Sequence, residues 1–571
     1  MTGRPRVALA VALLASAVSV LFVLDHTRED SLSADEPVHI LSGWLMAVSR
    51  NAIVNIEHPP LMKLLAGTAV SLLPLPPPPE RVPLGASFTE FGHGVLFANG
   101  AASADAIAAA ARAPFAGVLV ILLLLVYLAA RSRYGPIPAL FAVGLLAFDP
   151  NVIAHAGVVH TDLGAAAAFT AAVIAWEAAL SRPRAVSLGL AALALGLALV
   201  TKFSTVYLLP ILLLQGLLRT KSEPSPSRAV ARLAGLFAVV GAGGGVVVFA
   251  VYAHVCAHID PAVQRQVIHE MVAGRGAPSL SRSIEDVARL SPPIGQYLGG
   301  LASVARQNAV GGGVNYLNGR VSTAGFPAYF FVAFALKSTL AFVALTLVLL
   351  FALVRDPPTR REAALWLLPV AVLFLASIGA SYNIGIRHLL PVYPLLALAG
   401  AGILSRLLAA GRRAPALFLA ALPLLSLAET LAVRPHELSY FNALAGGPVR
   451  GRRILSDSNV DWGLDLKRLA AELKRRGVKD PTVVYFGGDD VFERVGVSDF
   501  AAEPRVRGRL VALSAFQQAV GPEFYAYHGA REVAGALERL RREVAARGRP
   551  AGRIGYSIDL YELSGEGTPR P

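Results

Sequence analysis

Cysteine is almost missing from this sequence. Among 571 residues, only Cys256 carries a thiol. One thiol cannot form an intrachain disulfide, and it cannot supply the cysteines of a structural zinc cluster. A disulfide framework and a cysteine-based metal domain are therefore excluded as the source of this fold.

Charge is also scarce. Charged residues make up 16% of the chain and hydrophobic residues 55%, whereas soluble globular domains carry roughly 25% charged residues. Apolar stretches of about 18 to 20 residues recur along the chain, which is the length of a helix that crosses a bilayer. The composition predicts a polytopic α-helical membrane protein rather than a soluble enzyme with one anchor.

The signatures of common soluble enzymes are missing as well. The sequence contains no P-loop, no His-Glu-x-x-His and no Gly-x-Ser-x-Gly pattern. The glycines at Gly241–Gly245 and Gly311–Gly313 lack the strand–loop–helix context of a nucleotide site. The net charge of +14 has an ordinary use in a membrane protein, because Arg and Lys collect in cytoplasmic loops. Nucleic acid is therefore not an expected partner.

The hydrophobic pattern predicts about eleven transmembrane helices. We place them at residues 7–24, 115–130, 137–154, 163–180, 185–201, 203–218, 233–253, 328–354, 363–381, 389–408 and 415–432. The connections on one side are basic and hold Arg131, Arg133, Arg182, Arg184, Arg219, Lys221, Arg228, Arg232, Arg355, Arg360, Arg361, Arg412 and Arg413. The positive-inside rule makes that side cytoplasmic, together with the N-terminus.

Three large segments then lie outside the cytoplasm, at residues 25–114, 254–327 and 433–571. The proline run Pro76–Pro79 in the first predicts an extended spacer. The second is long enough to predict a functional lid. The third follows a membrane domain of residues 1–432 and predicts a small α/β domain. We expect its helix at 464–476 and its strands at 454–455, 482–486, 510–513 and 554–560.

An acidic pair, Asp35-Glu36, follows the first predicted span. Ionisable residues close to a membrane are costly to keep unless they are solvated or used. A carboxylate here is suited to act as general base toward a hydroxyl. The alternative is a water-exposed acid that caps a helix beginning near Pro37.

The same segment contains His58-Pro59-Pro60-Leu61-Met62-Lys63. Its prolines predict a rigid entry into a helix, which places Lys63 in the first turn, where the helix dipole disfavours a cation. A bound anion such as a phosphate accounts for that position. The alternatives are a snorkelling lysine and a histidine that only fixes the turn.

Two further polar clusters are predicted at the outer ends of spans. Asp162 follows His160-Thr161, and it is either part of a pocket or an ordinary helix cap. Arg387-His388 precedes Leu389-Leu390-Pro391, where Arg387 is either an interfacial anchor or, with Lys63, a clamp for a lipid phosphate.

In this order, these motifs resemble those of the protein O-mannosyltransferase family and its bacterial relatives, among the C-type membrane glycosyltransferases. The matching elements are Asp35-Glu36, the His58–Lys63 motif, Phe148-Asp149-Pro150-Asn151 through His160-Thr161-Asp162, Thr201-Lys202-Phe203 and Arg387-His388-Leu389-Leu390-Pro391. The segment Ser456–Gly463 is similar to one in many bacterial members, but its residues suggest no chemistry.

The resemblance implies a polyprenyl-phosphate-linked sugar donor and an inverting single displacement on the outer face of the bacterial inner membrane. Asp35 would then deprotonate the acceptor hydroxyl, and Glu36 would orient the acceptor or the base. Lys63 and Arg387 would hold the donor phosphate and improve the leaving group. The residues that would shape the pocket are His58, Asp162 and His388.

Several choices remain open at this level. The acceptor is a protein, a lipid-linked glycan or a cell-envelope polysaccharide, and the sugar is not specified. We expect no cofactor; a divalent cation at Asp35 and Glu36 is an open alternative that the resemblance does not favour. The rival functions are a transporter or flippase of lipid-linked sugars, which requires ionisable groups near the bilayer midplane, and a non-catalytic assembly protein.

Overall fold

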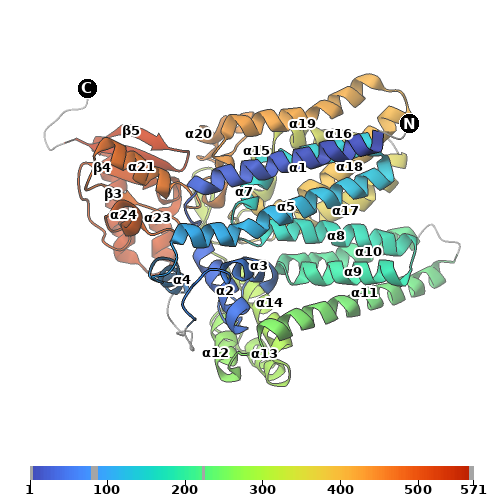
Figure 1. The fold of residues 1–571 in the computed structure, drawn as a ribbon, viewed down its shortest axis with the longest axis horizontal. Helices are drawn as coiled ribbons and strands as arrows, with labels where there is room; N and C mark the ends of the chain where they lie inside the picture. Colours follow the sequence, from blue (N-terminus) through green and yellow to red (C-terminus); the bar gives the residue numbers. More distant parts are fainter. Residues whose placement is uncertain (1–3, 79–87, 221–224, 356, 565–571) are drawn as a thin grey trace.

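The computed structural model describes residues 4–78, 88–220, 225–355 and 357–564. A helical bundle forms most of the molecule, and a smaller unit with a β-sheet lies at one end of it (Figure 1). Pro79 and Lys221, which entered the predictions above, lie outside the described residues.

Within the described ranges, seven helices are long and apolar enough to cross a membrane, and two bent helix pairs bring the number to as many as nine. The long helices are α1 (Arg4–Glu29), α5 (Ala104–Tyr134), α8 (Asp162–Ser181), η1 (Phe203–Tyr207) with α10 (Leu208–Thr220), α11 (Pro226–Val255), α18 (Val392–Ala409) and α19 (Arg413–Val433). Two further helices with apolar segments, α9 (Ala185–Leu199) and α17 (Pro357–Ile378), complete the bundle. Every predicted span coincides with one of these helices or pairs, so the polytopic helical fold is confirmed.

The bent pairs are α6 (Pro136–Ala147) with α7 (Pro150–Ala156), at 63°, and α15 (Tyr329–Lys337) with α16 (Leu340–Arg355), at 118°. At the first break, Asp149 caps α7 by accepting from the backbone N–H groups of Asn151 (2.9 Å) and Val152 (3.1 Å). The Asn151 side chain donates to the carbonyl of Lys337 at 2.8 Å. A side chain at the first break therefore satisfies a backbone carbonyl at the second, as irregular backbone in a membrane bundle requires.

The first two of the segments predicted to lie outside the cytoplasm are largely helical. They contain α2 (Glu36–Ser49), α3 (Pro60–Val70) and α4 (Phe88–Phe97), then α12 (Pro261–Val272), α13 (Pro278–Leu290), α14 (Pro292–Val310) and the antiparallel hairpin of β1 (Asn315–Leu317) and β2 (Arg320–Ser322). Helices α2 and α3 cross with their backbones in contact, because a Cβ on Gly67 would lie 1.9 Å from the carbonyl oxygen of Gly43. The crossing fixes the helix that carries Lys63 against the helix that follows Asp35.

The C-terminal unit contains four strands in the order β3-β4-β6-β5, with β3 parallel to β4 and the other pairs antiparallel. Its strands are β3 (Thr482–Val484), β4 (Leu510–Ser514), β5 (Gly548–Ile554) and β6 (Ile558–Leu563). Its helices are η3 (Glu437–Ser439), η4 (Ala443–Ala445), α20 (Gly447–Gly451), η5 (Asp457–Asn459), α21 (Leu466–Arg476), α22 (Val491–Val495), α23 (Ala515–Tyr527) and α24 (Arg531–Arg547). The predicted α/β unit is confirmed, whereas its boundary at residue 432 stays a prediction.

Two of the predicted strands are wrong in detail. Residues 454–455 follow α20 as a turn, because the backbone N–H groups of both bond back to the carbonyl of Gly451. The last predicted strand, 554–560, is split by a turn: Ile554 ends β5 and Ile558 begins β6. An apolar run alone does not mark such a turn, and Gly555, at φ +51°, is its local signal.

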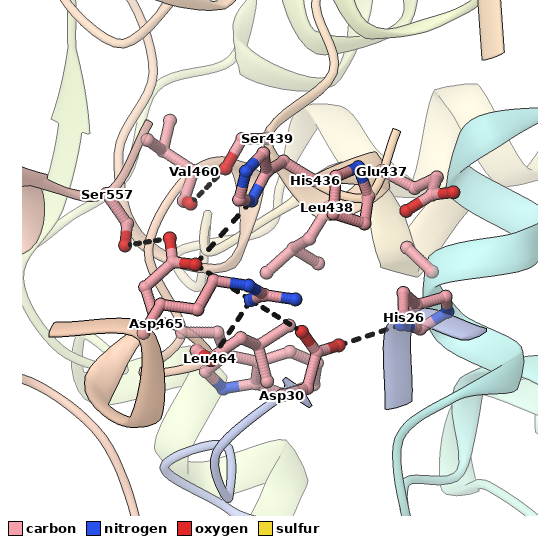
Figure 2. A pocket seen from close by; sticks show the side chains of 14 residues that line it. His26, Asp30, His436, Glu437, Leu438, Ser439, Val460, Leu464, Asp465 and Ser557 are labelled. Atoms are coloured by element: carbon pink, nitrogen blue, oxygen red, sulfur yellow. Dashed lines mark hydrogen bonds and ion pairs between the residues drawn. The ribbon is translucent and has the colours of Figure 1, made fainter. Parts of the chain in front are cut away.

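The sheet unit is hydrogen-bonded to the first outer segment. Ser31 and Ala34 donate their backbone N–H groups to the carbonyls of Leu464 (2.9 Å) and Trp462 (3.0 Å). Beside these bonds lies a cavity of about 20 Å³, lined by a polar cluster that includes His26, Asp30 and Asp465 (Figure 2). That volume fits about one water molecule. The junction is therefore a packed interface rather than a flexible tether.

Candidate active site

Asp35 precedes α2 as its N-cap residue, and α2 lies toward the end of the bundle that carries the sheet unit (Figure 1). Its side chain makes no helix-capping hydrogen bond and is 36% exposed. The cap that the sequence allowed is therefore not its role. The carboxylate instead faces residues from the loop before α8 and from η2 (Ile386–Leu389).

Arg387 and His160 are the partners of Asp35. The Oδ2 atom of Asp35 lies 3.3 Å from Nη1 of Arg387 and 3.4 Å from Nε2 of His160. Burial by itself would raise the pKa of Asp35, but the hydrogen bond from His160 and the charge of Arg387 outweigh it and hold that pKa well below its usual range. The carboxylate of Asp35 is therefore ionised, partly exposed to solvent and paired with the buried guanidinium of Arg387.

Asp162 is a buried carboxylate that contacts both His160 and Arg387. Its Oδ2 lies 2.5 Å from Nδ1 of His160 and 3.7 Å from Nη1 of Arg387, and its Oδ1 accepts from Lys202. Asp162 is 1% exposed, and it begins α8. The resemblance implied a pocket role for Asp162 and gave no role to Lys202, and the structure brings both residues to the same cluster.

Glu36 points elsewhere although it adjoins Asp35. Both of its oxygens pair with Arg112 on α5 at 2.7 Å, and they also accept from the backbone N–H groups of Ser33 (2.7 Å) and Val159 (3.1 Å). The side chain is fully buried. Its four interactions bind the start of α2 to α5 and to the loop before α8, and none of them reaches Asp35.

Lys63 is buried on α3 and has no carboxylate partner among the described contacts. Its Nζ donates to the backbone carbonyl of Asn55 at 2.7 Å, and Asn55 is held at φ +55°. Burial lowers the pKa of Lys63 to about 7, and the charge of Glu57 only partly offsets that effect. A buried lysine with carbonyl partners alone is a ready site for an anion.

His58 and His388 have different ring contacts. The His58 ring is 5.3 Å from that of His160, centroid to centroid, so His58 does join the site. His388 instead stacks on Phe330 of α15, with ring centroids 5.8 Å apart and planes at 19°. Burial holds the pKa of His388 well below its usual value. His388 therefore supports η2 from the bundle side.

Trp462 is a site residue to which sequence reasoning gave no chemistry. The guanidinium carbon of Arg387 lies 4.3 Å from the centroid of its ring, and the ring also contacts His160 at 5.3 Å. In the same segment, Asn459 accepts from the backbone N–H of Ile386 at 3.1 Å. The segment Ser456–Gly463 thus holds the Arg387 loop in place, and its concentration of polar residues with one tryptophan was the available signal.

The family comparison concerns a segment in the first half of the chain. Residues 103–242 match the model of the family described as dolichyl-phosphate-mannose-protein mannosyltransferase, which confirms the resemblance over this range. The range holds His160, Asp162 and Lys202, whereas Asp35, Lys63 and Arg387 lie outside it. No curated protein matches the sequence.

Solved structures give distant similarities. ArnT from Cupriavidus metallidurans, bound to undecaprenyl phosphate, is 15% identical with a TM-score of 0.45, and the match covers 100% of both chains. The Archaeoglobus fulgidus oligosaccharyltransferase in its apo form is 14% identical with a TM-score of 0.45. That match covers 74% of this chain and 56% of the archaeal one, so the chain spans little more than half of the archaeal enzyme.

Proposed function

We propose that the protein is a membrane glycosyltransferase that moves a sugar from a polyprenyl-phosphate-linked donor to an acceptor hydroxyl. The observation that carries the proposal is the ionised, one-third exposed carboxylate of Asp35 beside the buried guanidinium of Arg387. A base and a phosphate-binding cation at one site are the parts that a single displacement needs. The family match supports the same reaction class.

In this proposal Arg387 exchanges partners when the donor binds. The guanidinium is held by Asp35 and Asp162 and lies over Trp462. When the donor phosphate pairs with Arg387, the guanidinium no longer pairs with Asp35. The guanidinium is the main charge that keeps the pKa of Asp35 low. Asp35 then becomes a stronger base when the leaving group is in place, and Arg387 neutralises the phosphate as the glycosidic bond breaks.

Inversion follows from one displacement at the anomeric carbon. Asp35 takes the proton of the acceptor hydroxyl, the acceptor oxygen forms the new bond, and the lipid phosphate leaves with the electron pair of the old one. Lys63 is a second phosphate-binding candidate, because its ammonium group has only uncharged oxygen partners at Asn55. We assign Glu36 a positioning role through Arg112 instead of contact with the acceptor.

We place the site on the extracytoplasmic side of a plasma membrane, and we expect a protein, a lipid or a polysaccharide as acceptor. Basic side chains mark the opposite end of the bundle, where Arg133 and Arg219 pair with Glu177 at 2.9 and 2.7 Å. Positive charge at that end is typical of the cytoplasmic side.

A transporter of lipid-linked sugars is the rival from another class. It requires ionisable groups that are free to bind substrate between the membrane faces. Two such groups lie at the helix breaks, but Asp149 caps α7 and Lys337 donates to the carbonyls of Leu438 and Asn459 at 2.7 Å. These partners favour structural roles for both residues.

Reconstituted liposomes distinguish the two functions. Purified protein is mixed with a series of radiolabelled polyprenyl-phosphate sugars and with an envelope extract as acceptor. The proposal predicts label in the acceptor fraction for one donor, with Arg387→Ala inactive and His269→Gln, changed at an exposed residue on α12, fully active. Movement of donor across the bilayer without transfer would contradict the proposal.

A further inference from the structure

Three histidine rings meet beside Asp35. They come from α2 (His39), from the loop before α3 (His58) and from the loop before α8 (His160), and one nitrogen of each lies within 4.8 Å of the others. The ring centroids are 4.9 Å apart for His39 and His58 and 4.8 Å apart for His39 and His160. Sequence reasoning used His58 and quoted His160 but did not consider His39.

The nitrogen atoms of this cluster have uneven partners. Asp162 lies 2.5 Å from Nδ1 of His160, which leaves Nε2 facing the cluster. Nδ1 of His39 is buried and has no hydrogen-bond partner, and the whole residue is 1% exposed. A buried nitrogen without a partner is unfavourable, so a ligand that binds there is favoured.

We propose that His39, His58 and His160 bind a divalent transition-metal ion. Imidazole nitrogens are the preferred protein ligands of zinc, cobalt and nickel ions. Three of them with one open position form the ligand set of many exchangeable zinc sites. The contact of Asp162 with the remote nitrogen of His160 supplies the carboxylate–histidine arrangement that orients metal ligands.

Asp35 and Arg387 both adjoin the His160 nitrogen that would bind the ion. Nη1 of Arg387 lies 2.9 Å from Nε2 of His160, so the guanidinium and the ion compete for the same nitrogen. Ligand nitrogens around a tetrahedral zinc ion lie roughly 3.3 Å apart, given Zn–N bonds of about 2.0–2.1 Å. Binding of the ion therefore requires the three rings to rotate until their nitrogens lie closer together. Arg387 must also turn away from His160, toward an anion if one is present.

The test measures metal directly and needs neither donor nor acceptor, so it is independent of the proposed transfer reaction. Purified protein in detergent is stripped with a chelator and titrated with Co²⁺ and Zn²⁺. We expect one ion per chain by elemental analysis and the visible absorption of tetrahedral cobalt. His39→Gln and His58→Gln should each lose the ion, whereas His269→Gln, at the exposed histidine of α12, should keep it.

Arg387→Gln sharpens the test because it removes the competing cation. Its affinity for the ion should rise, on the order of tenfold. The elution volume in gel filtration and the helical circular dichroism of each variant confirm that it is folded. Equal metal content in wild type and in folded His39→Gln or His58→Gln, or no bound ion in any of the proteins, would overturn the proposal.

Discussion

Asp35 and Glu36 share a peptide bond, yet their carboxylates have different surroundings. Asp35 is 36% exposed and faces Arg387, whereas Glu36 is fully buried and pairs with Arg112. Removal of one partner of a buried ion pair leaves an uncompensated charge and typically costs about 3–5 kcal/mol. Removal of a part-exposed carboxylate costs far less.

Substitutions of Asp35 and of Glu36 are therefore expected to differ in their effects on stability and on transfer. Glu36→Ala should lower the thermal unfolding midpoint markedly, while Asp35→Ala should leave it nearly unchanged and abolish transfer. Glu36→Gln, which keeps an oxygen for the N–H of Val159, should lie between wild type and Glu36→Ala. Thermal unfolding of the purified proteins in detergent measures these midpoints. Inactive Glu36→Ala with wild-type stability would instead make Glu36 a catalytic residue.

The lowered pKa of Lys63 leads to a prediction of how donor binding depends on pH. Burial lowers its pKa to about 7, so its charge is present below pH 7 and is lost as the pH rises through that value. The phosphodiester of the donor keeps its charge over the same range. Donor affinity should be constant below about pH 6 and should weaken above pH 7 by up to tenfold per pH unit.

Two variants at the same position test the origin of this dependence. Lys63→Arg stays charged at every accessible pH, so its donor affinity should no longer change between pH 6 and 9. Lys63→Gln should bind weakly throughout. Equilibrium binding of a labelled polyprenyl-phosphate sugar, whose phosphodiester keeps one charge over this pH range, reports both. An unchanged pH profile in Lys63→Gln would show that the dependence comes from another group and would contradict this role of Lys63.

At the scale of single residues, the sequence identified as site candidates those residues whose type is unusual for their location. Asp35, Lys63 and Arg387 are charged residues beside apolar helices, and Asp35 and Arg387 do meet in the structure. The role of Trp462 could not be predicted, because the polar residues around it mark the segment but do not indicate a cation 75 residues away in the chain. The separation of Asp35 from Glu36 likewise depends on Arg112, which only tertiary packing brings near.

Helices α2 and α3 position the histidines and Lys63, and their contact depends on two glycines. A Cβ on Gly43 would lie 1.9 Å from the carbonyl oxygen of Lys63. Gly43→Ala should therefore force the helices apart, cost about 1–3 kcal/mol and weaken donor binding. The matched control is Gly189→Ala on α9, where a Cβ meets no atom within 4 Å and helix propensity improves by roughly 0.5–1 kcal/mol.

Thermal unfolding and donor binding of the two alanine variants give the answer. Equal stability of Gly43→Ala and Gly189→Ala would show that α2 and α3 do not need close contact.

The positions of the helices were predictable, but their breaks were not. Apolar runs at 137–154 and 328–354 gave single spans, whereas each is bent, by 63° and 118°. Asp149-Pro150 is a local signal for the first break, since proline favours the first turn of a new helix. The second break, after Lys337, has no such signal, and its carbonyl is satisfied by Asn151 from the other pair.

On the scale of the whole molecule, the account requires the site and the basic helix ends to lie on opposite sides of the membrane. Cys256 is buried, so a Cys256→Ala background is suited to labelling. A membrane-impermeant maleimide applied to spheroplasts should modify Ser279→Cys in α13, and it should reach Ser181→Cys at the end of α8 only after permeabilisation. The reverse pattern would contradict the proposed orientation.

The central claim is that Asp35 is the base of a sugar transfer. Its direct measurement is single-turnover transfer from a radiolabelled polyprenyl-phosphate sugar by purified wild type and Asp35→Asn, with donor binding measured on the same samples. The account predicts that Asp35→Asn binds donor at least as well, because Arg387 is no longer paired with a carboxylate at 3.3 Å, while transfer falls by about 10²–10⁴-fold. Equal transfer rates in the two proteins would contradict it.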